Sequence, residues 1–139
     1  MTCGTNPRGA VIESLDLATA AARFASDRKA EDVTVLDLGR KASYCDSFVI
    51  CTGTSRRHVR ALAEGIIHDL REIGQRPIGV EGVDASRWIL IDFGDVLVHV
   101  FEEPMRGFYD LEAMWADARR IPFEAQTAAA RGAAGQTRV

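Results

Sequence analysis

The stretch WILIDFGDVLVHVF, residues 88–101, decides the fold class, because two apolar runs flank the turn residues Gly94 and Asp95. This pattern is typical of a β-hairpin, in which the loop determines which residues face each other. With this loop, one face pairs only apolar side chains: Phe93 with Val96, Ile91 with Val98, and Ile89 with Val100. The opposite face carries Trp88, Leu90 and Asp92 against Leu97, His99 and Phe101. We therefore predict a hairpin with one core face and one mixed face.

Outward from the hairpin, the sequence predicts helices alternating with strands. Helical spacing of apolar residues predicts a helix over 7–28 and a second helix that begins after residues 52–55 and ends before Gly74. A third helix, capped by Asp110, is predicted to hold Leu111, Met114, Trp115 and Ala118. Strands are predicted over 33–38, 46–51 and 77–81, and Pro104 opens a helical turn. This order indicates an α/β fold with a mixed sheet packed with helices.

Length and composition indicate one domain with a packed core. The chain has 139 residues, of which 47% are hydrophobic and 27% charged, close to the averages for globular proteins. Residues 124–139 are mostly alanine, glycine, glutamine and arginine, with no aromatic residue. We therefore expect a folded domain over residues 7–123 and a disordered C-terminal tail over residues 124–139.

The charge balance limits the classes of partner. Seventeen basic and twenty acidic residues give a net charge of -3, which excludes the broadly basic surface of a general nucleic-acid binder. The sequence has no run of 18 apolar residues that could cross a membrane, and its N-terminus lacks a signal-peptide profile. The three cysteines have no metal-ligand spacing. We expect a cytoplasmic protein without a disulfide framework or a membrane partner.

The turn formed by residues 53–55 precedes a helix, a geometry that binds anions. Arg56, Arg57 and His58 follow in the first helical turn, where the helix dipole disfavours cations. Two interpretations stay open. Either an anionic partner compensates these side chains, or they are solvated, with Arg60 paired to Glu64.

No catalytic constellation is evident in the sequence. Asp92 and Asp95 flank the hairpin turn and resemble the magnesium-binding pair of nucleotidyltransferases, but turn chemistry explains Asp95. The three histidines, His58, His68 and His99, are scattered, and sequence places none of them beside a serine or cysteine nucleophile. We therefore expect no catalytic residues, no metal and no cofactor, with a magnesium-dependent nucleotidyltransferase as the rival hypothesis.

Two longer segments carry a family resemblance. The segments VLDLGRKASYCDSFVICTGTSRRHVRALAE (residues 35–64) and PIGVEGVDASRWILIDFGDVLVHVFEEPMRGFYDLEAMW (residues 77–115) strongly resemble the Iojap-type ribosomal silencing factors. The similarity covers residues 11–121, and the combination of CTGTSRRHV, WILIDFGDVLVHVF and FYDLE is highly specific.

The resemblance implies a nucleotidyltransferase-like fold without catalytic residues. It also implies a translation repressor that binds the large ribosomal subunit through a ribosomal protein at the subunit-joining face. The bound protein then blocks association with the small subunit and reads no nucleic-acid sequence. A role in large-subunit assembly is the alternative, and the resemblance allows a homodimer of the free protein.

An aromatic anchor surrounded by polar groups is the arrangement expected of such an interface. The resemblance places the characteristic Trp, Asp and His of the family at Trp88, Asp92 and His99. We also expect Arg57, His58 and Tyr109 to bind the partner. Trp88 is either covered by a helix of its own chain or left as a recognition surface, and the sequence leaves both open.

Overall fold

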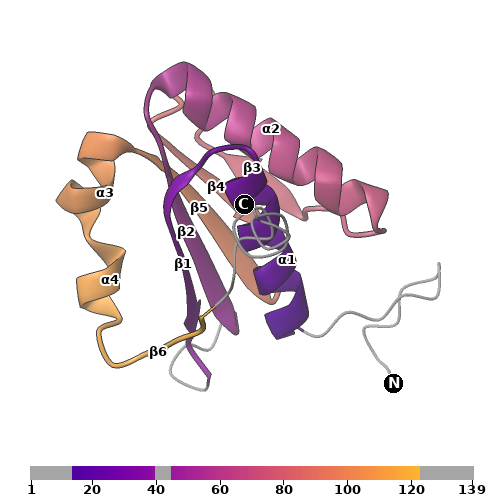
Figure 1. Cartoon of the computed structure of the whole chain (residues 1–139), viewed down its shortest axis with the longest axis vertical. Coiled ribbons are helices and arrows are strands. Elements are labelled where there is room, and N and C mark those ends of the chain that lie inside the picture. The colour runs from indigo at the N-terminus through magenta and orange to yellow at the C-terminus, as the bar shows by residue number, and fades with distance from the viewer. Residues whose placement is uncertain (1–13, 40–44, 123–139) are drawn as a thin grey trace, which may run out of the picture.

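The computed structural model describes residues 14–39 and 45–122, which form a mixed six-stranded sheet with helices against both faces (Figure 1). In chain order the elements are α1 (Ser14–Asp27), β1 (Glu31–Asp37), β2 (Ser47–Gly53), α2 (Arg56–Glu72), β3 (Gly79–Glu81), β4 (Trp88–Asp92), β5 (Val96–Glu102), α3 (Glu103–Tyr109), α4 (Leu111–Met114) and β6 (Arg119–Arg120). The strand order is β3-β4-β5-β2-β1-β6, in which β2 and β5 are parallel and the other neighbours antiparallel. The predicted α/β class with a mixed sheet is confirmed.

The hairpin forms in the register that the sequence predicts. Ile89 pairs with Val100 and Ile91 with Val98, and the Phe93 amide donates to the Val96 carbonyl at 2.9 Å. Gly94 has a φ of 91°, a backbone conformation that is strained for residues with a side chain. The four paired residues of the apolar face are completely buried, so this face is core as expected.

Two separate cores lie on the two faces of the sheet. Helices α1 and α2 cover one face, while α3 and α4 lie against the other (Figure 1). Strand β2 lies between β1 and β5, and all of its residues are buried because both of its faces are covered. The second core consists of Leu36, Leu38, Cys45, Phe48, Ile50, Phe101 and Ala118, with Trp88, Leu97, Met105, Leu111 and Trp115 partly buried around it.

The C-terminal part of the described chain differs from the prediction. The helix capped by Asp110 was expected to include Ala118 but ends at Met114, and β6 follows it. Strand β6 pairs with Leu36 and Asp37, and its Arg119 forms an ion pair with Asp37 at 2.9 Å. Two consecutive arginines have no sequence pattern typical of a strand. Strand β6 therefore forms only because the edge of β1 offers backbone groups with which it can pair. Residues 7–13 of the expected first helix and the expected tail 124–139 lie outside the described residues.

Helix α2 begins and ends where the sequence predicts. The Ser55 hydroxyl oxygen accepts a hydrogen bond from the His58 amide at 3.0 Å, and Gly74 follows the helix with a φ of 88°. Gly53 allows the strand to approach the helix closely, because a Cβ there would lie 2.9 Å from the Val59 nitrogen. The start of α2 is thus held by side-chain capping and by close backbone packing.

Replacing Ser55 with alanine is expected to lower the free energy of unfolding by about 1 kcal/mol, because the His58 amide loses its acceptor. Urea unfolding followed by circular dichroism measures this change. Ser26→Ala is the matched control, since the Ser26 hydroxyl has no hydrogen-bond partner among the described residues. Equal stabilities of the two variants would show that the cap contributes nothing.

Candidate partner-binding surface

Trp88 lies at the centre of a group of aromatic rings on the mixed face of the sheet. Its ring centroid is 4.5 Å from that of Tyr109 and 5.0 Å from that of Phe101. Phe108 packs edge-on against Tyr109 at 5.1 Å. Phe101 is buried, whereas Trp88 is half-buried and Tyr109 and Phe108 are 43% and 75% exposed. We call the three accessible rings, Trp88, Phe108 and Tyr109, the aromatic surface.

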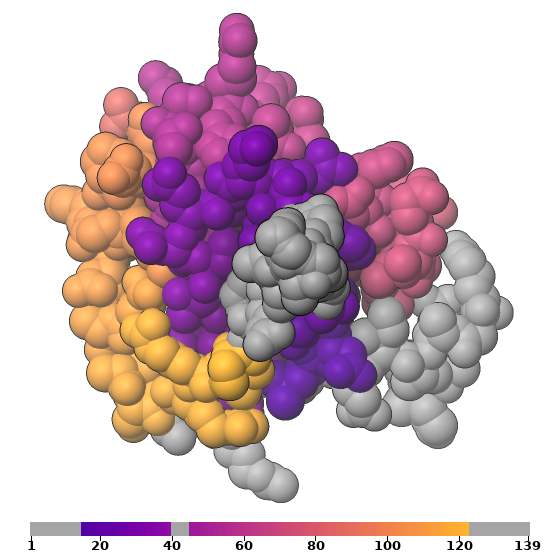
Figure 2. All heavy atoms as spheres, in the orientation of Figure 1, coloured from indigo at the N-terminus to yellow at the C-terminus, as the bar shows by residue number. Residues whose placement is uncertain are grey.

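The aromatic surface combines the start of β4 with the end of α3. Helices α3 and α4, residues 103–114, form the strap, which is drawn in orange along one flank of the molecule in Figure 2. The interpretation that a helix of the same chain covers Trp88 is therefore partly confirmed, and a role as a recognition surface stays a prediction. A helix of the same chain covers one side of the indole, and the remainder stays accessible next to Tyr109.

His99 supports the indole from within the protein. Its Nδ1 accepts a hydrogen bond from Trp88 Nε1 at 3.1 Å, so a neutral ring carries its proton on Nε2. The side chain is only 4% exposed, and Nε2 has no hydrogen-bond partner within the described part of the chain. Burial lowers the His99 pKa to about 4, so the imidazole is neutral at physiological pH. His99 is too buried to contact a partner directly and instead orients Trp88.

Asp92 shares the sheet face of Trp88 but lies at the opposite end of β4. The two residues are four positions apart in the strand, which corresponds to roughly 13 Å. The Asp92 Oδ1 accepts a hydrogen bond from the Gly94 amide at 2.7 Å, which accounts for a carboxylate at the end of an apolar strand. The structure therefore brings Trp88 and His99 together and leaves Asp92 at the hairpin turn.

The first turn of α2 presents a second, basic surface. His58 is occupied internally, since its Nδ1 accepts from the Thr54 amide at 3.0 Å and its Nε2 lies 3.2 Å from the Arg28 carbonyl oxygen. Arg57 is exposed. It lines a groove of about 310 Å³ together with Arg56, Arg60, Asp84, Ala85 and Ser86.

The structure bears on one of the two interpretations of this basic turn, and compensation by an anionic partner stays a prediction. Arg60 pairs with Glu64 at 3.5 Å, as in the solvated interpretation. Arg56 donates to the Ala85 carbonyl at 3.2 Å. Within this turn, Arg57 and His58 are the residues expected to bind a partner. The structure leaves Arg57 accessible, while His58 contacts the Arg28 carbonyl just after α1.

The buried thiols lack the chemistry of a nucleophile. Burial raises the pKa of Cys51 to about 12 and that of Cys45 to about 11, so both are protonated at neutral pH. Within residues 14–39 and 45–122, no three His, Cys, Asp or Glu side chains are placed to hold a metal ion. In the same ranges no helix combines the length and apolarity needed to cross a membrane.

Comparison with known proteins identifies the family. The family model described as "Ribosomal silencing factor during starvation" matches residues 11–139. The chain belongs to this family. The resemblance inferred from the sequence motifs is thereby confirmed, and with it a coarse function: the family consists of regulators of translation that act on the ribosome.

Several ribosomal silencing factors and their plant relatives are similar to this chain. The ribosomal silencing factor of Bacillus subtilis is 42% identical over 98 residues, which are 70% of this chain and 83% of that protein. The chloroplastic protein Iojap of Arabidopsis thaliana is 38% identical over 83% of this chain and 49% of its own length. A crystal structure from Chromobacterium violaceum has a TM-score of 0.73 and 34% identity, covering 81% of this chain and 92% of that one.

Sequence reasoning missed Phe108 as a member of this ribosomal silencing factor's aromatic surface. Consecutive residues of a helix point about 100° apart, so α3 cannot turn both Phe108 and Tyr109 towards the sheet. Two adjacent aromatic residues at the end of a short predicted helix were therefore the available indication. The second omission is Arg106, whose contacts join the strap to the sheet.

Proposed function

We propose that this ribosomal silencing factor binds the large ribosomal subunit through a ribosomal protein on the subunit-joining face and blocks association with the small subunit. The observation that carries the proposal is the aromatic surface, where Phe108 is 75% and Tyr109 43% exposed beside a half-buried Trp88. Adjacent exposed rings of this kind are typical of protein recognition sites. We place this action in the cytoplasm.

The charges on the strap favour a protein over RNA as the direct partner of the aromatic surface. Glu103 and Asp110 are exposed on either side of Tyr109 in the chain, and Glu102 immediately precedes the strap. These carboxylates repel the phosphates of ribosomal RNA. Helix α2 begins at the same end of the sheet as α3, because Gly53 pairs with Glu102. We assign the exposed Arg57 in its first turn to the edge of the same interface.

The proposed mechanism is steric occlusion and requires no bond to be made or broken. A standard interface buries about 800 Å² of each partner, which a domain of this size can supply from the aromatic surface and its surroundings. A bound domain on the joining face prevents the small subunit from reaching its contacts. Catalysis therefore has no part in the proposed function.

Sucrose-gradient sedimentation with purified subunits tests the proposal. The protein is expected to migrate with large subunits and not with small ones, and to reduce the fraction of joined ribosomes when added before mixing. The matched control is the Trp88→Ala variant at the same concentration. Equal migration with both subunits, or binding that leaves subunit joining unchanged, would contradict steric silencing.

Self-association of the free protein is a further part of the proposal. Phe108 and Met114 are 75% and 69% exposed on the strap, so an apolar surface is available to a second copy in the absence of ribosomes. Sedimentation equilibrium is expected to show a dimer that Phe108→Ser converts to a monomer. A monomer at all concentrations would contradict the proposed dimer and leave the proposal of ribosome binding intact.

A further inference from the structure

The strap that carries the aromatic surface has little apolar support of its own. Neither α3 nor α4 contains a fully buried residue. Met105 and Leu111 are only partly buried against the second core. Helices of seven and four residues are unstable without tertiary contacts. Another interaction must therefore hold the strap in place.

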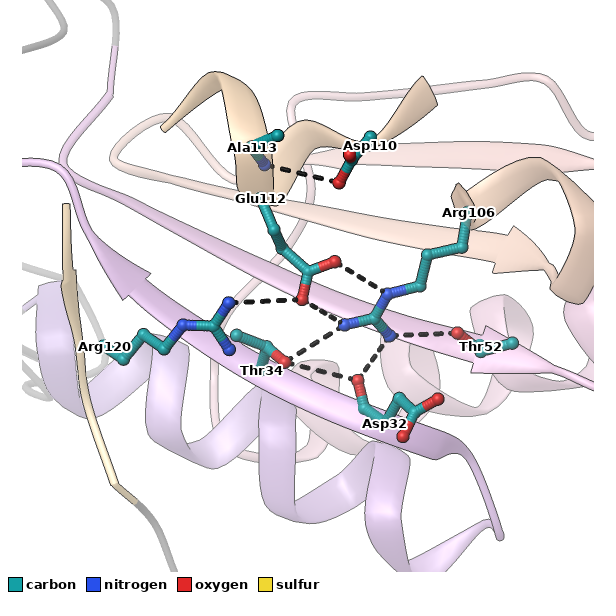
Figure 3. A network of polar contacts seen from close by, with 8 residues as sticks. All are labelled: Asp32, Thr34, Thr52, Arg106, Asp110, Glu112, Ala113 and Arg120. Carbon is teal, nitrogen blue, oxygen red and sulfur yellow. Dashed lines mark hydrogen bonds and ion pairs between the residues drawn. The ribbon is translucent and has the colours of Figure 1, made fainter. Parts of the chain in front are cut away.

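Arg106 of α3 supplies that interaction (Figure 3). Its Nε and Nη2 donate to the two carboxylate oxygens of Glu112 at 3.2 and 2.7 Å. Nη2 also donates to the Thr34 hydroxyl at 3.1 Å, and Nη1 donates to the Thr52 hydroxyl at 2.9 Å and to the Asp32 carbonyl oxygen. A guanidinium has five N–H donors, and here each has an acceptor. The side chain is only 12% exposed.

These contacts join elements that are far apart in the sequence. Thr34 lies in β1, Thr52 in β2 and Glu112 in α4, so one guanidinium fixes α3 to the sheet and also to the other half of the strap. Between α3 and α4, Asp110 has a φ of 47°, which an L-residue rarely adopts without surrounding support. The Arg106–Glu112 ion pair spans this joint.

The environment of the Arg106–Glu112 pair requires a planar guanidinium at position 106. Hydrogen bonding from Arg106 lowers the pKa of Glu112, and Arg120 adds a second cation 3.8 Å from the same carboxylate. The Thr52 side chain is 2% exposed, and its hydroxyl has no partner other than Arg106 within the described chain. Lysine has the charge but lacks the planar fork, so it cannot satisfy the carboxylate and both hydroxyls together.

We propose that Arg106 is the positioning residue of the aromatic surface: it holds the strap on the sheet and thereby sets Tyr109 against Trp88. Tyr109 is three residues after Arg106 on the same helix, and its ring centroid lies 4.5 Å from that of Trp88. Arg106 itself is too buried to be a principal partner contact. The expected effect of Arg106 on subunit binding rests on the proposed function. Its expected effect on the strap is measured by hydrogen exchange and does not depend on ribosomes.

The structural readout is hydrogen exchange with Arg106→Lys and Arg106→Met. Both variants are expected to exchange the amides of residues 103–115 about tenfold faster or more, while the amides of α1, α2 and β2 stay protected. Arg119→Met is the matched control, because Arg119 is also paired with a carboxylate but is 67% exposed and outside the strap. Unchanged exchange in the strap, or faster exchange throughout the domain, would overturn the proposal.

The binding readout is a double-mutant cycle with Tyr109→Ala on large subunits. Each single variant is expected to weaken binding about tenfold, and the combination to weaken it little further, because Arg106 acts through the position of Tyr109. Fully additive losses would overturn the positioning role. Failure of the parent protein to bind large subunits would instead contradict the proposed function and leave the hydrogen-exchange result to decide the role of Arg106.

Discussion

Replacing Trp88 with alanine is expected to weaken binding to the large subunit by about 2 kcal/mol or more, a loss of roughly 30-fold. The indole packs against both Phe101 and Tyr109, and His99 fixes its orientation. Alanine removes both the accessible ring and the surface against which Tyr109 rests. Sedimentation of a concentration series with purified large subunits measures the loss.

The stability of the Trp88 variant must be measured separately, because the indole is half-buried and hydrogen-bonded. We expect Trp88→Ala to cost about 1–3 kcal/mol of folding stability, less than a fully buried tryptophan would. Ile78→Ala is the matched control, since Ile78 is 74% exposed and its amide donates to the Asp92 carbonyl at the other end of β4. Normal large-subunit binding by a folded Trp88→Ala variant would contradict the anchor.

The second large effect expected is a loss of stability in mild acid caused by His99. Burial lowers the His99 pKa to about 4 in the folded protein, whereas an unfolded histidine has a pKa of about 6.5. At pH values between these two pKa values, His99 is protonated in the unfolded chain but neutral in the folded protein, so acid favours unfolding. The free energy of unfolding is unaffected by protonation of His99 well above pH 6.5 and decreases as the pH falls, by about 2 kcal/mol at pH 5 and by somewhat more at pH 4.

Urea unfolding at several pH values measures this effect, and His99→Gln provides the comparison. Glutamine does not titrate, and its amide oxygen can accept the hydrogen bond from Trp88 Nε1. The variant is expected to lose less stability than the parent between pH 6.5 and pH 5, whatever its stability at neutral pH. Identical slopes in that range would show that His99 is not the group responsible.

Local patterns predict those parts of the fold in which neighbouring residues decide the conformation. Alternation in residues 88–101 predicts the hairpin register, and Ser55 and Gly74 predict the limits of α2. The same alternation places Trp88, Asp92 and His99 on one face, as the structure confirms. The spacing along the strand also places Trp88 and Asp92 at opposite ends of that face, but the pattern does not reveal their different contacts.

Only the tertiary structure decides which of these side chains a partner can reach. His99 and Trp88 face the same side of adjacent strands, yet the covering elements leave one 4% exposed and the other half-buried beside Tyr109. No periodicity predicts this difference, because exposure depends on what packs above the sheet.

The sequence by itself determined the family, the mixed α/β class, the hairpin register and the caps of α2, since each depends on residues close together in the chain or on specific motifs. The tertiary structure alone decided the short strand β6, the burial of His99 and the hydrogen-bond partners of Arg106. The acceptors of Arg106 on the sheet lie 54, 72 and 74 residues away in the chain. A guanidinium is a favourable partner for many acceptors, and only folding brings this particular set within hydrogen-bonding distance.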